Sequence, residues 1–259
     1  MPPCPNEPIA IIGSGCRFPG NASSASSLWE LLQDPRDCLT EIPKDRFNWE
    51  GYHYANGPHH GSNITKYSHF LEEDIRKFDP QFFNIQPAEA ETIDPQQRLL
   101  LETVYEGLES AGLTLESLQG SSTAVYVGLM SCDYTDVVQG DIDCIPKYAG
   151  TGISRSIHSN RISYFFDWHG PSMTIDTACS SSMVALHLAV QSLRSGESSV
   201  AVACGASLII TPRMVAPGSQ WPPLSGGREN SARNINERIL DANYDELTTD
   251  LIKNPIGQD

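Results

Sequence analysis

One cysteine, Cys179, stands where a chain could present a nucleophilic thiol. It lies in the heptapeptide DTACSSS (176–182), between an apolar, β-rich run at 171–175 and apolar side chains at helical spacing over 183–193. Cys179 therefore falls at a predicted strand-to-helix turn. There the unpaired N–H groups and the positive dipole end of the helix favour thiolate over thiol, and the amides can receive a developing oxyanion.

Two readings of this segment stay open at the level of residue types. Free cysteine is among the most buried residues, so Cys179 could be an inert core thiol. The serines at 180–182 keep the first helical turn small and polar, which suits the approach of a substrate carbonyl. Serines at this position could equally be ordinary helix caps.

The elements around the cysteine alternate between strands and helices. Strands are predicted at 9–13, 123–128, 171–175 and 200–205, and helices at 28–32, 95–111, 153–166 and 183–193. Such alternation favours an α/β sheet with both faces covered. Gly13-Ser14-Gly15 lacks the third glycine of a dinucleotide fingerprint, since Phe18 occupies that place, and is predicted to be a tight turn. A polar, Gly- and Pro-punctuated excursion spans about residues 36–68.

Composition and charge exclude several classes of function. The 259 residues carry 17 basic and 32 acidic side chains, a net charge of −15 that would repel nucleic acid. Seven scattered cysteines form neither a disulfide framework nor a metal-binding pair, which fits a reducing compartment. No signal peptide or membrane-spanning run is evident, and the basic residues form no patch for a membrane. We therefore expect a cytoplasmic protein with neither nucleic acid nor membrane as partner.

Four segments in a fixed order add up to a family resemblance. They are EPIAIIG with CRFPG (7–20), DPQQRLLLE (94–102), NRISYF with GPS (160–172), and DTACSSS (176–182). Together they resemble the β-ketoacyl synthase domain of modular polyketide synthases, most closely the fungal reducing type. The resemblance implies the N-terminal half of a thiolase-like fold, an α/β structure whose mixed, mostly parallel sheet is covered by helices. It predicts an N-terminal extension at 1–6, the synthase domain at 7–212, and a divergent, partly disordered tail at 213–259.

The resemblance also implies a chemistry for Cys179. In this family the cysteine accepts an acyl group from the phosphopantetheine thioester of an acyl carrier protein, and a malonyl carrier is then decarboxylated to the enolate that attacks it. The expected partners are therefore the carrier protein, or acyl and malonyl thioesters, with no cofactor or metal bound by the chain itself. A homodimer formed through the edge strand before Cys179 is also implied, as is association with a full-length synthase.

The sequence departs from the family from Arg213 onward. The family's two histidine motifs and a glycine-rich loop follow the nucleophile, and none of them is present here. His187, the one histidine after Cys179, is predicted to pack along its helix rather than act at the thiol. A single helix is predicted in the tail, through Ile235, Ile239, Leu240, Leu247 and Leu251. The chain therefore resembles a truncated synthase, for which complete condensation would need the histidine-bearing half.

Three hypotheses follow. The first is a condensing-enzyme fragment in which Cys179 is acylated while condensation depends on the missing half. The second is a non-catalytic interaction module that binds a full-length synthase. The third is a cysteine-dependent thioesterase or acyltransferase, for which His158 is the nearby candidate base.

Overall fold

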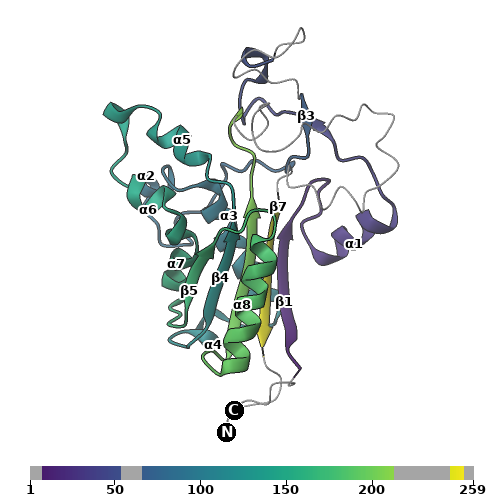
Figure 1. The fold of residues 1–259 in the computed structure, drawn as a ribbon, viewed down its shortest axis with the longest axis vertical. Coiled ribbons are helices and arrows are strands. Elements are labelled where there is room, and N and C mark those ends of the chain that lie inside the picture. The colour runs from purple at the N-terminus through teal and green to yellow at the C-terminus, as the bar shows by residue number, and fades with distance from the viewer. Residues whose placement is uncertain (1–7, 54–65, 213–245, 254–259) are drawn as a thin grey trace.

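A five-stranded sheet forms the centre of the computed structural model, which describes residues 8–53, 66–212 and 246–253 (Figure 1). The strand order is β1-β7-β6-β4-β5. The five strands are β1 (Ala10–Arg17), β4 (Ala124–Leu129), β5 (Ser172–Ile175), β6 (Val200–Ser207) and β7 (Glu246–Lys253). Because β7 is antiparallel to both of its neighbours while β6, β4 and β5 are mutually parallel, four of the five strands point the same way. The predicted mixed, mostly parallel sheet is confirmed.

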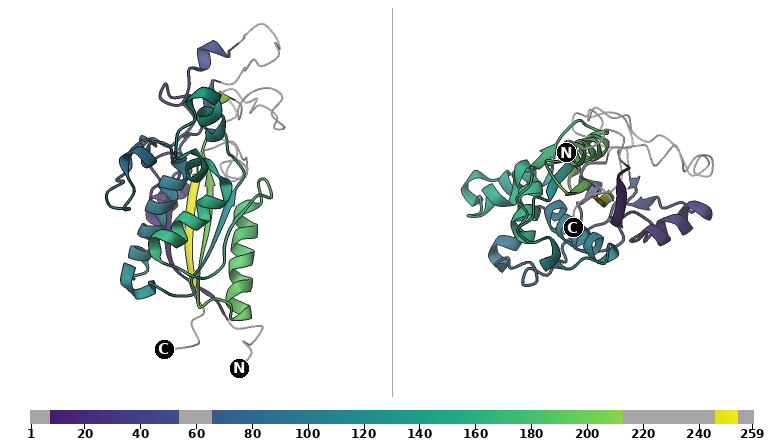
Figure 2. Two further views of the ribbon diagram at one scale, coloured as in Figure 1. Left: turned by 90° about the vertical axis from the view of Figure 1, so that its left-hand side faces the viewer. Right: turned by 90° about the horizontal axis from the view of Figure 1, so that it is seen from below.

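Helices cover both faces of this sheet (Figure 2). On one face α3 (Pro95–Ser110) packs against β1, β7 and β6, and α7 (Arg155–Phe166) packs against β4 and β5. On the other face α8 (Ser181–Ser195) packs against β4 and β6, and α1 (Ala25–Gln33) lies beside β1. The shorter elements are β2 (Thr40–Glu41), η1 (Trp49–Gly51), β3 (Tyr67–Ser68), α2 (Pro87–Ala90), α4 (Leu115–Leu118), α5 (Tyr134–Gln139), η2 (Ile142–Cys144) and α6 (Ala149–Ile153).

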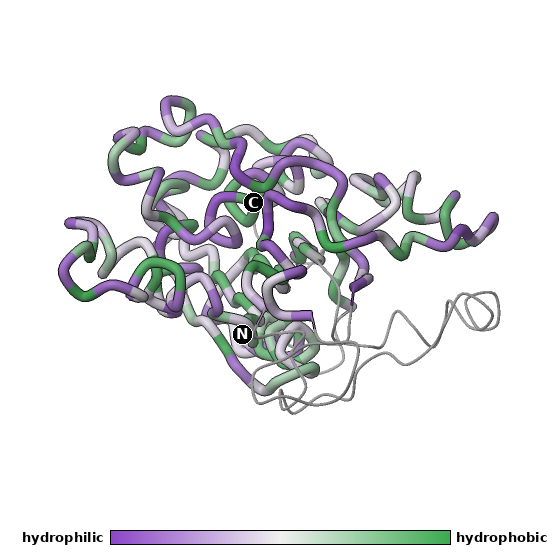
Figure 3. The backbone as a smooth tube through the Cα atoms, turned by 90° about the horizontal axis from the view of Figure 1, so that it is seen from above, coloured by the Kyte–Doolittle hydropathy of each residue, from purple (hydrophilic) through white to green (hydrophobic). Residues whose placement is uncertain are grey.

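Hydrophobic and hydrophilic residues are interleaved along the peripheral segments, as Figure 3 shows. Among the described residues, no helix combines the length and the apolar character needed to cross a membrane.

Helix α3 begins where the sequence predicts. Asp94 is the N-cap and accepts a hydrogen bond from the Gln96 amide at 2.8 Å, while Pro95 fills the first helical position, where no amide donor is required. The helix lies very close to β1. A Cβ at Gly13 would come within 2.2 Å of the Gly107 carbonyl oxygen, so this glycine permits the contact. The predicted tight turn at Gly13–Gly15 is therefore wrong, because these residues run on within β1.

Strand β7 corrects the expectation of a helix in the tail. Leu247 and Leu251 belong to a strand that pairs with β1 on one side and β6 on the other. Alternate residues of β7 face opposite sides, and Leu247 and Leu251 join the buried cluster beneath α3. The remaining residues of the predicted helix, at 235–240, lie outside the described residues. The described part of the expected tail is thus an inner strand of the sheet.

Candidate functional site

Cys179 lies in the turn that links β5 to α8, as predicted. Strand β5 ends at Ile175 and α8 begins at Ser181. Ala178 adopts a left-handed backbone with φ of 57°, a conformation that costs a residue with a Cβ about 1–2 kcal/mol. Cys179 itself is exposed, so the alternative of a cysteine buried in the core is wrong. An exposed thiol beside a strained residue makes this turn a candidate functional site.

The serines after Cys179 hold the turn in place. The Ser181 hydroxyl accepts a hydrogen bond from the Thr177 amide at 2.9 Å and donates one to the Ala178 carbonyl at 2.6 Å. The Ser180 hydroxyl donates to the Thr177 carbonyl at 2.8 Å. Ser180 is the N-cap residue of α8 but makes no capping bond to a helix amide. These hydroxyls therefore offset the strain at Ala178 rather than cap the helix in the usual way.

Two glycines let the first turn of α8 touch the sheet. A Cβ at Gly128 of β4 would lie 2.5 Å from the carbonyl carbon of Ser181, and one at Gly205 of β6 would lie 2.8 Å from the Ser182 Cβ. Both are distances that real Cβ atoms essentially never show. In the sequence these glycines stand in apolar strand runs with no sign of their role. In the structure they fix how deeply the turn of Cys179 is seated.

An arginine that the sequence did not single out joins the site. Arg155 forms an ion pair with Asp176 and donates hydrogen bonds to Cys132 Sγ at 2.9 Å and to the Met130 carbonyl at 3.5 Å. Hydrogen bonds to Cys132 and to Asp176 raise the pKa of Arg155, so its charge is secure. Asp176 in turn accepts a bond from the Ala178 amide at 3.1 Å. Only its place on the first turn of a helix, where a cation is unfavourable, could have drawn attention to Arg155.

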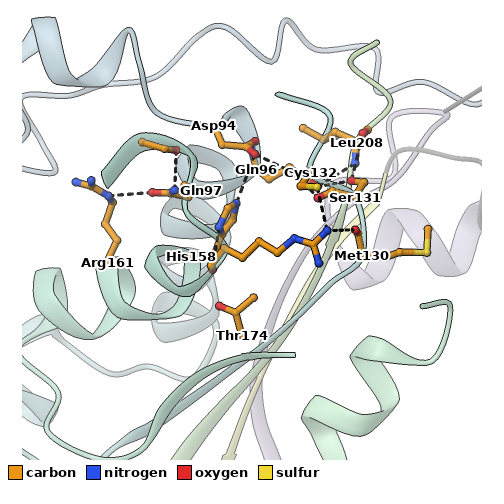
Figure 4. Close-up of polar contacts among 12 residues, drawn as sticks. Asp94, Gln96, Gln97, Met130, Ser131, Cys132, His158, Arg161, Thr174 and Leu208 are labelled. Carbon is orange, nitrogen blue, oxygen red and sulfur yellow. Dashed lines mark hydrogen bonds and ion pairs between the residues drawn. The ribbon is translucent and has the colours of Figure 1, made fainter. Parts of the chain in front are cut away.

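The histidines of the described residues do not gather at Cys179. His158 is 1% exposed, with Nδ1 3.2 Å from the Arg155 carbonyl and Nε2 3.6 Å from a carboxylate oxygen of Asp94 (Figure 4). It is thus held inside the core by its neighbours. His187 is exposed, so the predicted packing role is wrong for this chain. Its helix position, two turns beyond Cys179, is as predicted.

Buried polar side chains connect the carboxyl ends of β4 and β6 close to His158 (Figure 4). Gln96 Nε2 donates to the Ser131 carbonyl at 3.2 Å, and its oxygen accepts from the Leu208 amide at 3.2 Å. Asp133 accepts from the amides of Ile210 and Thr211. These bonds fix the segment that follows β6 against the loop that follows β4.

A groove of 350 Å³ opens between α8 and α1, on the face of the sheet that α8 covers. Its lining is mainly apolar, with Phe18, Leu28, Met183 and Leu186, and Asp250 of β7 also borders it. Burial raises the pKa of the Asp250 carboxyl. No cluster of three or more potential metal ligands occurs within residues 8–53, 66–212 and 246–253.

Comparison with known proteins assigns this arrangement to a family. The profile described as "Beta-ketoacyl synthase, N-terminal domain" matches residues 6–235. The chain belongs to the β-ketoacyl synthase family. It is 63% identical over 221 residues to the hybrid PKS-NRPS synthetase mpsA of Macrophomina phaseolina, a match that covers 85% of this chain and 6% of that synthetase. It is 61% identical over 238 residues to the lovastatin nonaketide synthase mokA of Monascus pilosus, covering 88% of this chain and 8% of that synthase.

Solved ketosynthases share the fold. The ketosynthase from module 6 of the bacillaene synthase of Bacillus subtilis 168 superimposes with a TM-score of 0.78 and 31% identity, over 95% of this chain and 40% of that one. The oxazolomycin ketosynthase domain OzmH KS7 of Streptomyces albus JA3453 gives 0.77 and 31%, over 96% and 43%. The predicted N-terminal half of a thiolase-like fold is confirmed. This ketosynthase chain spans less than a tenth of the two fungal synthases and under half of the two solved ketosynthase chains.

Proposed function

We propose that this ketosynthase chain performs the acyl-accepting step of polyketide chain extension, with Cys179 as the nucleophile. Its sulfur attacks the carbonyl of an acyl group carried on the phosphopantetheine of an acyl carrier protein. A new thioester forms, and the pantetheine thiol leaves with the proton. The observation that carries the proposal is the exposed cysteine on a strained strand-to-helix turn in a member of this family. The amide of Cys179 would stabilise the oxyanion.

The later condensation is proposed for the assembly that supplies the family's histidines. There a malonyl thioester loses carbon dioxide, and the resulting enolate attacks the acyl-cysteine. The family places two histidine motifs downstream of the nucleophile, and this sequence contains neither. We therefore propose that residues 7–212, together with β7, form the part of the site that holds the acyl group. Residues 1–6 are proposed to be an N-terminal extension of this domain. The proposed location of the protein is the cytoplasm.

A second copy of the chain, or a full-length synthase, is the proposed protein partner. Strand β5 is the last strand of the sheet order and pairs only with β4 among the described residues. Its Met173 is 48% exposed, and Tyr164 of the neighbouring helix α7 is 88% exposed. An open strand edge beside exposed apolar side chains favours pairing with another chain. This edge favours the hypothesis of an interaction module, whether or not the chain is also catalytic.

Acylation is tested by intact mass after incubation with an acyl-pantetheine thioester, and in parallel with a thiol-directed inhibitor of condensing enzymes. We expect one acyl adduct on the wild type, none on Cys179→Ala, and an unchanged adduct on Cys144→Ala, which removes a different exposed thiol. Folded wild type without an adduct would contradict the proposal. Release of free acid over many turnovers would favour the thioesterase hypothesis instead.

Pairing at β5 is tested by analytical ultracentrifugation. If the edge forms the dimer, Met173→Glu converts it to monomer and leaves acylation of Cys179 unchanged. A wild type that sediments as a monomer at every concentration, with or without the parent synthase, would contradict the proposed interface.

A further inference from the structure

The turn that carries Cys179 is tied to the rest of the sheet by one cation. Arg155 contacts the turn through its ion pair with Asp176, and it contacts the loop after β4 through Met130 and Cys132. Strands β4 and β5 are parallel neighbours, and α7 is the helix that connects them. The guanidinium therefore bridges the carboxyl ends of two adjacent strands, the edge where α/β proteins place their sites.

Arg155 lies at a position of its helix that is electrostatically unfavourable for a cation. It is the first residue of α7, and the positive end of a helix dipole disfavours a cation there. No acidic residue occurs in the first turn of α7 to compensate. The negative partner is Asp176, 21 positions away in the sequence. A locally unfavourable residue that is satisfied only by a distant partner points to a role in the site.

Asp176 passes this constraint to the nucleophile. One of its carboxylate oxygens pairs with Arg155, and the other accepts the amide hydrogen of Ala178, the residue directly before Cys179. Ala178 is the residue in the left-handed conformation. Fixing the Asp176 carboxylate thus fixes the peptide that orients the thiol.

We propose that Arg155 is a positioning residue for Cys179, acting through Asp176. The inference rests on the proposed function of Cys179 as the nucleophile. Arg155 does not touch the reacting sulfur in this arrangement. It holds the strained turn in the conformation that exposes the thiol. Its hydrogen bonds to Cys132 and Met130 fix the position of the guanidinium.

The test is the alkylation rate of Cys179 by iodoacetamide, measured by peptide mass spectrometry relative to Cys144 in the same molecule. Iodoacetamide needs no carrier or acyl group, so this readout succeeds or fails independently of acylation. Cysteines 16 and 204 are buried beside the groove, so labelling of them above the wild-type rate reports on opening of the core. The matched control is Arg76→Gln, which removes another exposed Arg–Asp pair, with Asp74, that does not contact the turn.

We expect Arg155→Gln to slow alkylation of Cys179 about two- to fivefold relative to Cys144, the scale of a partly exposed ion pair. Asp176→Asn should slow it by a similar factor, and the double variant should be no slower than either single variant. Arg155→Lys should restore most of the rate, and Arg76→Gln should leave it unchanged.

Because Arg155 and Asp176 carry opposite charges, variants of the two residues distinguish a positioning role from a direct electrostatic effect on the thiolate. If Arg155 acted only by attracting the thiolate, removing the negative charge in Asp176→Asn would speed alkylation, whereas positioning predicts that it slows. A faster Asp176→Asn, or Arg155→Gln at the wild-type rate, would overturn the proposal. Faster labelling of cysteines 16 and 204 in Arg155→Gln than in the wild type would also overturn it, since the arginine would then support the whole fold.

Discussion

The two faces of the sheet are built from side chains of different size. On β4, the residues that face α3 and α7 are Val125, Val127 and Leu129, whereas the opposite face carries Ala124, Tyr126 and Gly128. The cluster beneath α3 and α7 is dominated by leucine and valine, and the cluster beneath α8 is mostly alanine. The first face stabilises the fold by apolar burial. The second lets α8 and the turn that precedes it lie directly on the backbone of the sheet.

Strand β7 shows the same asymmetry within eight residues. Leu247 and Leu251 are buried beneath α3, while Asp250, which borders the groove, is carried on the α8 side. A carboxylate is tolerated on this side because the groove leaves it partly solvated. The predictions below test whether the two faces differ as this comparison requires.

The largest effect is expected for a charge placed on the α3 face of β7. Leu251→Asp would bury an unpaired carboxylate at a position that is 1% exposed, and we expect it to cost more than about 4 kcal/mol and to abolish cooperative folding. Urea unfolding followed by circular dichroism measures this. Thr248→Asp, the matched control on the groove side, should cost less than about 1 kcal/mol. A well-folded Leu251→Asp would show that β7 is not part of the core.

A smaller loss of stability is expected when a side chain is added on the face of the sheet that α8 contacts. Gly128→Ala forces a Cβ against the Ser181 backbone, and we expect a cost of about 1–3 kcal/mol together with slower alkylation of Cys179 relative to Cys144. Urea unfolding measures the loss of stability, and iodoacetamide labelling measures the alkylation rate. Gly150→Ala is the control, because a Cβ there meets nothing within 4 Å. Lower stability with unchanged labelling would separate the seating of α8 from the reactivity of the turn.

The polar ends of the strands should make stability depend on pH. Burial raises the pKa of Asp133 from 3.8 to about 6, despite the backbone hydrogen bonds that lower it. The native state therefore binds this proton more tightly than the unfolded chain, and its contribution to stability is complete below about pH 4 and lost as the pH rises through about 6. Asp133→Asn should remove this slope, worth up to about 3 kcal/mol across this pH range, from denaturation curves collected between about pH 4 and about pH 6. An identical slope in wild type and variant would contradict the assignment.

The smallest effect is expected at the rim of the groove. Helix α1 has no buried residue, and a capping box between Ser24 and Ser27 closes its N-terminus. Ser24→Ala should weaken α1 by about 1 kcal/mol, seen as faster hydrogen exchange of its amides, while global unfolding stays unchanged. Ser26→Ala, on the exposed surface of the same helix, should not speed exchange. A global loss of stability would mean that α1 supports the core after all.

Much of the fold could be predicted because its signals are local. The helix that begins at Pro95 follows from its capping aspartate and its apolar spacing, and the turn at Cys179 follows from a β-rich run placed directly before a helical one. The prediction for β7 failed because Leu247 and Leu251 also fit a helical spacing. Pairing selected the strand: the partners of β7 lie 230 or more positions earlier in β1 and 39–53 positions earlier in β6.

The sequence by itself determined the family, the order of the main elements from β1 to β6 and Cys179 as the candidate nucleophile, because motifs and periodicity depend on neighbouring residues. The tertiary structure decided that Cys179 is exposed, that His158 lies in the core beside Asp94, and that Arg155 reaches the turn through Asp176. These features depend on which strand ends meet and how closely a helix approaches a sheet. Such distances arise from packing among segments far apart in the chain, and no local pattern encodes them.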